Sequence, residues 1–286
     1  MRAASAIIRH LRAEPFAAVG GTIYAVILVM AVFAPQLAPY DPRAMLRQGR
    51  RIARYLPISP EHWLGTTSGG QDVLSQLIYG ARAALEVGLT AAIAVVAIGS
   101  LLGLLAGYLG GWVDKVVTRV ADIALGLPFL PFMLVLASLT APGTRVVIVT
   151  VALLLWPNTA RVIRAQVLSL RERAWVEAAR VTGCSTGRIM FVHVLPQVLP
   201  LAALYGSVAI GWAILAEAAA SFLGFGDPNT ISWGVMLQDA YANQALGRGA
   251  WNWFTPPGAA IVLMVLAGFL ISRGSEKLLF PKLADA

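Results

Sequence analysis

The side chains that could act as catalysts or ligands are few in this sequence, and their spacing fits no common catalytic site. His10, His62 and His193 are too far apart in sequence to suggest a metal site. There is no Gly-x4-Gly-Lys-Ser/Thr loop to hold nucleotide phosphates and no Gly-x-Ser-x-Gly turn to present a nucleophile. Cys184 is the one cysteine, so no intrachain disulfide can form. The sequence therefore argues against an enzyme and against a cofactor bound by this chain.

One polar stretch between apolar segments, residues 174–196, combines a carboxylate with small side chains. Its first part predicts a short helix, because apolar and small residues recur at i, i+3, i+4 and i+7: Trp175, Ala178, Ala179 and Thr182. Such a helix offers small side chains on one face. Another protein could approach that face closely.

The polar residues of this stretch predict how it turns. Glu177 and Arg180 are three positions apart and can support each other on an adjacent face of the helix. Gly183 suits the end of the helix, because glycine adopts left-handed backbone conformations without strain. Ser185 can cap a second short helix that ends at Pro196. We call residues 174–196 the elbow.

A second carboxylate, Glu217, directly follows a long apolar run. A charge inside a bilayer is costly and usually faces an interior cavity, so a functional role is one interpretation. The other is that Glu217 lies at the membrane interface, one position past the end of the span. Both interpretations stay open on the sequence alone.

The composition places the chain among integral membrane proteins. Hydrophobic residues make up 58% of the sequence and charged residues only 13%, compared with about 25% charged residues in soluble domains. The net charge of +8 comes mostly from loops between apolar runs, where Lys and Arg set topology and meet anionic lipid headgroups. No nucleic-acid recognition motif accompanies this charge, so membrane lipid is an expected partner and nucleic acid is not.

Six apolar segments predict an all-α protein with six transmembrane helices, since about 20 apolar residues cross a bilayer. Pro128 and Pro131 predict a kink within the third segment. The fourth segment reaches full length only if Arg161 and Arg164 extend to the interface. The expected spans are residues 16–37, 87–109, 123–141, 146–160, 194–216 and 250–272.

Glycines recur in the second expected span, mostly four positions apart: Gly88, Gly99, Gly103 and Gly107. Small residues at this spacing let two membrane helices approach closely. We therefore expect this span to pack tightly against a neighbouring helix.

Six spans place both termini and the elbow on one side of the membrane. That side carries 14 of the 22 Lys and Arg residues, and the other side carries 8, so the bias favours a cytoplasmic elbow and cytoplasmic N- and C-termini. Five arginines between residues 43 and 54 oppose this bias, although charges in long loops have less influence on membrane orientation. In a five-span alternative residues 146–160 do not cross, and the C-terminus lies outside.

The elbow resembles the EAA loop of bacterial ABC importer permeases. The shared positions are Glu177-Ala178-Ala179, then Gly183, and then Leu195-Pro196, at the family's spacing. His193 stands where the general pattern has Ile, and a His is usual there in the oligopeptide/dipeptide/nickel branch. This departure indicates that branch.

Two further stretches resemble the same branch. Residues 62–82 are similar to the signature before the second helix, with Thr67 and Gln71 in place of the family's Asp and Arg, which removes a possible ion pair. Residues 217–237 are similar to the stretch after the fifth helix, which reads like EASLSFLGLG followed by SWGxML. The resemblance covers about residues 62–272.

The resemblance implies the type I ABC importer permease fold, with the elbow as a cytoplasmic coupling helix that docks on a separate ATPase. It implies a bacterial cell membrane location, a second homologous permease, two ATP-binding subunits that hold ATP and Mg, and an extracytoplasmic substrate-binding protein. The implied coupling residues are Trp175, Glu177, Ala178, Ala179, Arg180 and Gly183. The implied translocation path or outer gate contains Glu217, Phe222, Trp233 and Met236.

Three parts of the chain follow from this reading. Residues 1–82 form a basic leader, the first helix and an extracytoplasmic connection; residues 83–273 form the permease core; residues 274–286 form a cytoplasmic tail. The expected substrates are di- or oligopeptides, with nickel or another small solute as the alternative. A secondary transporter and a non-transporting scaffold remain as other classes, although nearly charge-free spans without a visible repeat speak against the former.

Overall fold

The computed structural model describes residues 14–140, 142–227 and 229–279, which are largely helical. Most of the expected basic leader and the end of the expected tail lie outside these residues. The helices are α2 (Pro15–Val32), α3 (Ala34–Leu37), α4 (Val73–Leu109), α5 (Gly111–Gly126), α6 (Phe129–Leu139), α7 (Thr144–Arg171), α8 (Ala174–Val181), α9 (Thr186–Arg188), α10 (Leu195–Phe222), α11 (Trp233–Ala242) and α12 (Trp251–Leu279). A π-helical turn, Ile189–Val194, joins α9 to α10, and a small hairpin pairs β1 (Arg47–Gln48) with β2 (Arg51–Ile52).

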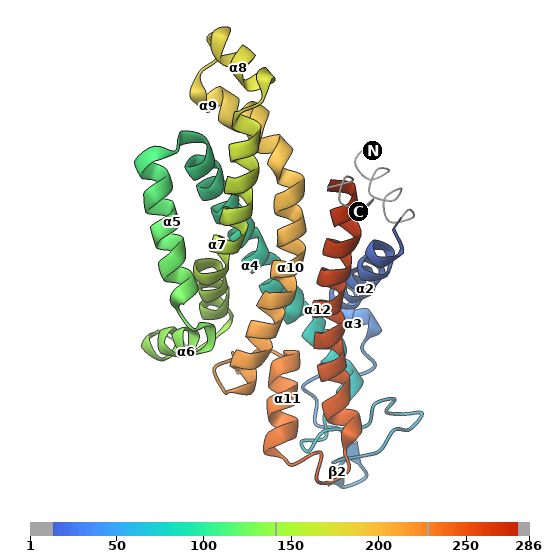
Figure 1. Cartoon of the computed structure of the whole chain (residues 1–286). Helices are drawn as coiled ribbons and strands as arrows, with labels where there is room; N and C mark the ends of the chain where they lie inside the picture. The colour runs from blue at the N-terminus through green and yellow to red at the C-terminus, as the bar shows by residue number, and fades with distance from the viewer. Residues whose placement is uncertain (1–13, 141, 228, 280–286) are drawn as a thin grey trace.

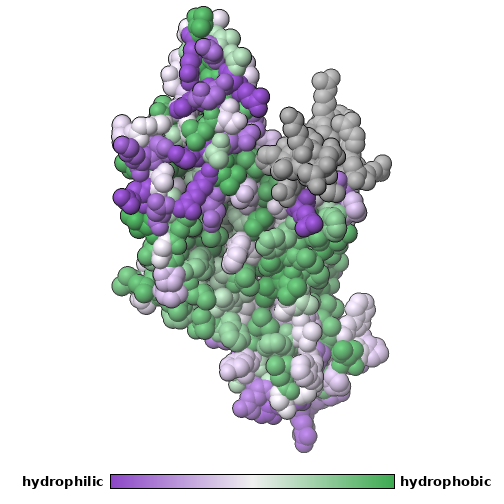
Figure 2. Space-filling model, in the orientation of Figure 1, coloured by the Kyte–Doolittle hydropathy of each residue, from purple (hydrophilic) through white to green (hydrophobic). Residues whose placement is uncertain are grey.

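The long helices run between two polar ends of an elongated molecule (Figure 1). We call the end that carries α8 and α9 the elbow end, and the end that carries the β-hairpin and α11 the hairpin end. The visible surface between these ends is mainly apolar (Figure 2). An apolar belt between polar ends is what a membrane-spanning protein requires, because the lipid hydrocarbon cannot solvate charged groups.

Five helices are long and apolar enough to cross a membrane, and a sixth span is possible if the bent pair α5 and α6 is one span. The prediction of an all-α membrane protein is therefore confirmed. The third expected span, residues 123–141, is wrong as a single kinked helix. Its first part belongs to α5, which begins earlier and takes in the charged residues expected to form a loop, and α6 turns from α5 by 89°.

Pro128 explains the break between α5 and α6. A proline disfavours helical backbone at the residue before it, and Leu127 is extended with φ −82° and ψ 127°. Pro131 lies in the first turn of α6, where backbone N–H groups have no acceptor within the helix, so a proline is tolerated there. Of the two prolines, only Pro128 therefore interrupts the helix.

The fourth span is stronger than the sequence indicates, because α7 extends over 28 residues. Arg161 and Arg164 are not isolated charges, because both side chains pair with carboxylates of α5. Arg161 Nη2 lies 2.6 Å from Asp122 Oδ1, and Arg164 makes a two-pronged contact with Asp114 that includes an Nη2–Oδ2 distance of 2.6 Å. The length of α7 argues against the alternative in which residues 146–160 do not cross, and a total of six spans then depends on the bent pair α5 and α6.

The glycines of α4 pack this helix tightly against α7, as their spacing predicts. A Cβ atom on Gly103 would lie 2.6 Å from the carbonyl oxygen of Ala160, and one on Gly107 would lie 2.8 Å from that of Arg164. Real Cβ atoms do not approach backbone oxygens so closely, so only glycine fits here. The close approach fixes the position of α7, which leads directly into the elbow.

Helix α4 begins well before the expected second span, and its first turn is fastened to the hairpin end. Asp72 caps α4 by accepting hydrogen bonds from the backbone N–H and the hydroxyl of Ser75, both at 2.8 Å. The expected boundary after residue 82 falls inside this helix. At the elbow end, α12 runs back beside α2, where a Cβ on Gly274 would lie 2.7 Å from Ala17.

Candidate functional site

The elbow projects from one end of the molecule (Figure 1) and has the predicted helix–glycine–helix form. Gly183 follows α8 with a φ of +79°, a conformation that glycine adopts without strain. Ser185 Oγ then accepts a hydrogen bond of 3.4 Å from the backbone N–H of Arg188 and caps α9. Both residues therefore do what their types indicate.

The second helix of the elbow does not end at Pro196, as the sequence led us to expect. The chain passes through the π-helical turn Ile189–Val194 into α10, with Pro196 in the first turn of that helix. Proline has no backbone N–H to donate. The first turn of an α-helix and the π-helical turn before it both tolerate the absence of this donor. The elbow is thus continuous with a membrane-spanning helix, and a force on it reaches α10 directly.

One side of α8 is anchored and the other is free. Val176 is fully buried, whereas Glu177 and Ala178 are exposed and Trp175 is 36% exposed. Val181 is 83% exposed, which is unusual for an aliphatic side chain at a polar end of a protein. Trp175 and Val181 thus leave apolar surface exposed beside the Glu177 carboxylate on the free side of α8.

Arg180 does not support Glu177 but holds the elbow to α4. Its guanidinium lies 5.5 Å from the ring centre of Tyr108, and its Nη2 donates to the Tyr108 hydroxyl at 3.4 Å. Arg171, at the end of α7, donates to the Tyr108 carbonyl oxygen at 3.4 Å. The buried Tyr108 therefore joins α4, α7 and α8, a role that no sequence signal indicates.

At the hairpin end, Glu217 connects α10 to α11. The carboxylate is buried, and its Oε1 accepts a hydrogen bond of 2.7 Å from Ser221 Oγ, with Ser232 as a second hydroxyl neighbour. Ser232 also caps α11, because its Oγ accepts from the N–H of Val235 at 3.2 Å. The structure thus places Glu217 inside the subunit, among hydroxyl groups that satisfy a buried carboxylate.

The other predicted path residues lie on or beside α11. Trp233 is 2% exposed, and its Nε1 donates to the Leu77 carbonyl oxygen of α4 at 2.9 Å; Met236 is equally buried. Phe222 is partly exposed and packs against Tyr241 with ring centres 5.5 Å apart. A role of these residues in a translocation path stays a prediction, and their burial gives Trp233 and Met236 a packing role within this subunit.

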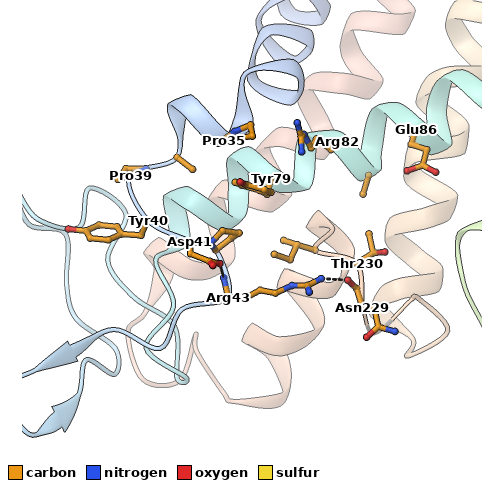
Figure 3. A pocket seen from close by; sticks show the side chains of 14 residues that line it. Pro35, Pro39, Tyr40, Asp41, Arg43, Tyr79, Arg82, Glu86, Asn229 and Thr230 are labelled. Carbon is orange, nitrogen blue, oxygen red and sulfur yellow. Dashed lines mark hydrogen bonds between the residues drawn. The ribbon is translucent and has the colours of Figure 1, made fainter.

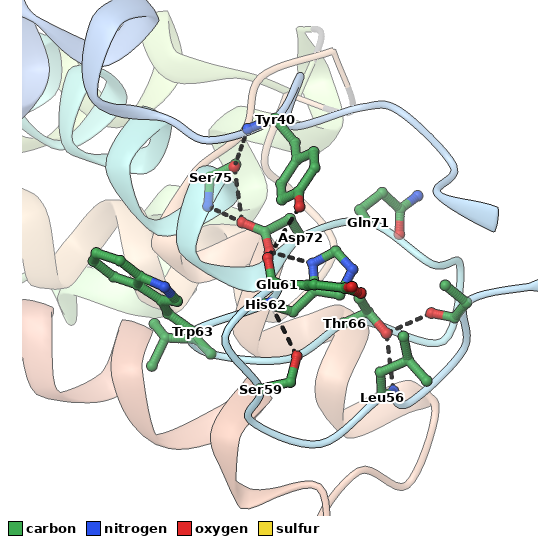
Figure 4. Close-up of polar contacts among 12 residues, drawn as sticks. Tyr40, Leu56, Ser59, Glu61, His62, Trp63, Thr66, Gln71, Asp72 and Ser75 are labelled. Atoms are coloured by element: carbon green, nitrogen blue, oxygen red, sulfur yellow. Dashed lines mark hydrogen bonds and ion pairs between the residues drawn. The ribbon is translucent and has the colours of Figure 1, made fainter. Parts of the chain in front are cut away.

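A polar network fixes the connection before α4 (Figure 4). His62 Nδ1 lies 3.1 Å from the oxygen of Asp72 that does not cap the helix, and both side chains are buried. The Tyr40 ring stacks at a tilt over His62, with ring centres 5.1 Å apart. The segment that the resemblance singles out is therefore built around the first turn of α4.

Thr67 and Gln71, which stand in place of an expected ion pair, remain in contact. The Thr67 hydroxyl donates to Gln71 Oε1, and the two backbones are joined by a hydrogen bond of 2.9 Å from Thr67 N to Gln71 O. A neutral hydrogen bond thus takes the place of opposite charges. The loop closes here without an ion pair between these two residues.

Comparison with known proteins agrees with this architecture. Residues 99–285 match the family described as "Binding-protein-dependent transport system inner membrane component", and residues 5–57 match the "N-terminal TM domain of oligopeptide transport permease C". The first match alone covers more than half of the chain.

Several curated proteins are similar over nearly the whole chain. A protein of Brucella suis biovar 1 whose name describes a peptide permease is 37% identical over 268 residues, 93% of this chain and 87% of its own. The dipeptide transport system permease protein DppC of Alkalihalophilus pseudofirmus is 33% identical over 276 residues, 96% of this chain and 88% of its own. The di/tripeptide transport system permease protein DppC of Pseudomonas aeruginosa is 36% identical over 280 residues, 94% of this chain and 89% of its own.

The range of the first family match, residues 99–285, includes the elbow and the segment around Trp233. The chain therefore belongs to the family of binding-protein-dependent transport system inner membrane components, among the DppC- and OppC-like ABC permeases.

Proposed function

We propose that this permease imports di- or oligopeptides, handed over by a substrate-binding protein, through a path that it shares with a second, homologous permease. The relatives named for dipeptides and tripeptides support this substrate class over nickel or another small solute. In this proposal the elbow end faces the cytoplasm of a bacterial cell and the hairpin end faces outward.

The observation that carries the proposal is the free face of the elbow. Glu177, Ala178 and Val181 are exposed at the tip of a structure that is continuous with α10 and bonded to α4 through Tyr108. A separate ATPase subunit that binds this face would move two membrane-spanning helices together. Rigid-body movement of packed helices between two arrangements is a general way to open and close a path.

In this mechanism the permease does no chemistry on ATP. Two separate ATP-binding subunits hold ATP and Mg, and the permease converts their closure into a change of access. The chain's own residues transmit movement: Gly183 sets the angle of the elbow, Arg180 and Tyr108 connect it to α4, and Arg171 connects the same point to α7.

The test is reconstitution of the transporter from its parts. The permease, its companion permease and the ATPase subunits are co-purified, placed in liposomes and supplied with binding protein, labelled peptide and ATP. We expect peptide uptake that needs ATP and every subunit. Uptake by this chain alone on an ion gradient would instead support a secondary transporter.

A further inference from the structure

The hairpin end contains a polar cavity of about 650 Å³ that the mechanism above does not use (Figure 3). It lies between the segment that follows α2, residues 79–86 of α4, and the loop before α11. A cavity of this size can hold a small molecule, since ligand pockets in proteins are roughly 300–1,000 Å³.

Two opposite charges face this cavity from one helix. Arg82 and Glu86 are one turn apart on α4, and Figure 3 shows their charged groups separated along the helix. Their side chains form no ion pair with each other among the described residues. Opposite charges four positions apart on a helix usually attract each other, so their separation leaves each free to bind something else.

The protein occupies these two groups only in part. The Arg82 Nε donates to the Ala31 carbonyl oxygen at 2.7 Å, and its guanidinium carbon lies 5.6 Å from the centre of the Tyr79 ring. This arrangement fixes the guanidinium plane while no described residue bonds its terminal nitrogens. The Glu86 carboxylate has no hydrogen-bond or ion-pair partner among the described residues.

Two further charged groups face the cavity, and each makes one hydrogen bond within the protein. Asp41 Oδ1 accepts from the backbone N–H of Arg43 at 2.8 Å, and the Arg43 guanidinium donates to the Asn229 carbonyl oxygen. Glu86 is exposed and directly precedes the charge-free run of residues 87–109. Four charged groups, two of each sign, thus line the cavity, and Glu86 is the one whose side chain makes no hydrogen bond or ion pair among the described residues.

We propose that Glu86 and Arg82 form a recognition subsite for a zwitterionic short peptide, with Glu86 receiving the terminal ammonium group and Arg82 the terminal carboxylate. The inference rests on the proposed peptide import and names the residues that contact the peptide. The helix rise separates the Cα atoms of Arg82 and Glu86 by about 6 Å along the axis, and the two ends of an extended dipeptide are separated by roughly 7 Å. A guanidinium binds a carboxylate through two parallel hydrogen bonds, which favours the C-terminal group over a neutral amide.

The test measures binding of charge-altered dipeptides to the assembled transporter in nanodiscs, without binding protein, so that only the membrane subunits select. The probes are radiolabelled dialanine, N-acetyl-dialanine, which lacks the ammonium, and dialanine amide, which lacks the carboxylate. The wild-type complex should bind dialanine at least tenfold more tightly than either derivative, since a charged hydrogen bond contributes about that factor.

Glu86→Gln should abolish the preference for dialanine over N-acetyl-dialanine and keep the preference over the amide. Arg82→Gln should do the reverse, and Arg82→Lys should restore part of the preference over the amide. The readout is a ratio between two ligands, and a folding defect lowers binding of both equally. Glu61→Gln, an exposed carboxylate at the same end but outside the cavity, is the matched control and should leave both ratios unchanged.

Equal affinity of the wild-type complex for all three ligands, unchanged ratios in the Glu86→Gln variant, or no binding of dialanine to the wild-type complex would overturn the subsite. Peptide uptake into liposomes by the same preparation tests the proposed function separately. Uptake without charge selection would reject the subsite and retain peptide import, whereas an active ATPase without uptake would reject peptide import itself.

Discussion

At the scale of single residues, Gly183 is the position where the elbow depends most on backbone conformation. Its φ is +79°, and the space around a would-be Cβ atom is open, so a substitution here acts through strain and not through a clash. A left-handed conformation costs a β-branched residue roughly 1–2 kcal/mol or more, while Asn tolerates it.

We therefore expect Gly183→Val to reduce peptide uptake at least tenfold and Gly183→Asn to keep most of it. Both variants should be present in the membrane in normal amounts, because residue 183 makes no packing contact. Uptake by reconstituted complexes, normalised to permease content, measures the effect. Equal uptake by the two variants would show that the elbow angle does not matter.

Glu177 allows a cleaner test of the docking surface, because its exposed carboxylate makes no hydrogen bond or ion pair within the described chain. Glu177→Lys should leave the melting temperature of the permease unchanged and should reduce both uptake and co-purification of the ATPase by at least tenfold. The matched control is Glu172→Lys, an exposed carboxylate two residues before α8 that pairs only with the neighbouring Arg171. If the two variants co-purify with the ATPase equally well, Glu177 is not part of the docking surface.

At the scale of secondary-structure elements, Tyr108 decides whether a movement of α8 reaches α4. Tyr108→Phe keeps the ring under Arg180 and removes only a long hydrogen bond, so its effect should be within about twofold. Tyr108→Leu removes both interactions and should reduce the number of peptides imported per ATP hydrolysed. Parallel assays of uptake and phosphate release measure this ratio, and an unchanged ratio in Tyr108→Leu would exclude a coupling role.

The contact between α4 and α7 makes a stability prediction at the same scale. Gly103→Ala places a methyl group 2.6 Å from a backbone oxygen that cannot move aside easily, and overpacking of this kind costs about 1–3 kcal/mol. We expect a clear fall in the melting temperature of the detergent-solubilised permease. Gly126→Ala, at the end of α5 where a Cβ atom meets nothing within 4 Å, should have no such effect.

At the scale of the whole molecule, the proposed orientation places the hairpin outside the cell and the elbow inside. In a Cys184→Ser background, Arg50→Cys should react with a membrane-impermeant maleimide in intact spheroplasts. Val181→Cys should react only after the membrane is opened, and both positions are exposed enough to label. The opposite labelling pattern would invert the topology and place the elbow beyond the reach of a cytoplasmic ATPase.

The sequence by itself determined the features that depend on local order. Apolar run length predicts the spans, glycine spacing predicts the close approach of α4 to a neighbour, and the residues around Gly183 predict the elbow. The sequence misplaced the third span because the backbone restriction imposed by Pro128 competed with a continuous apolar run, and length alone could not decide between them.

Only the tertiary structure decided which distant side chains meet. Arg180 bonds Tyr108 across 72 positions, Trp233 bonds the backbone of Leu77 across 156, and Arg43 bonds Asn229 beside the polar cavity. Periodicity and composition describe a residue's own helix, whereas these contacts depend on how the helices pack against each other. The same packing directs Arg82 toward the end of α2 and leaves Glu86 unpaired among the described residues. No pattern in the amino-acid sequence specifies these two outcomes.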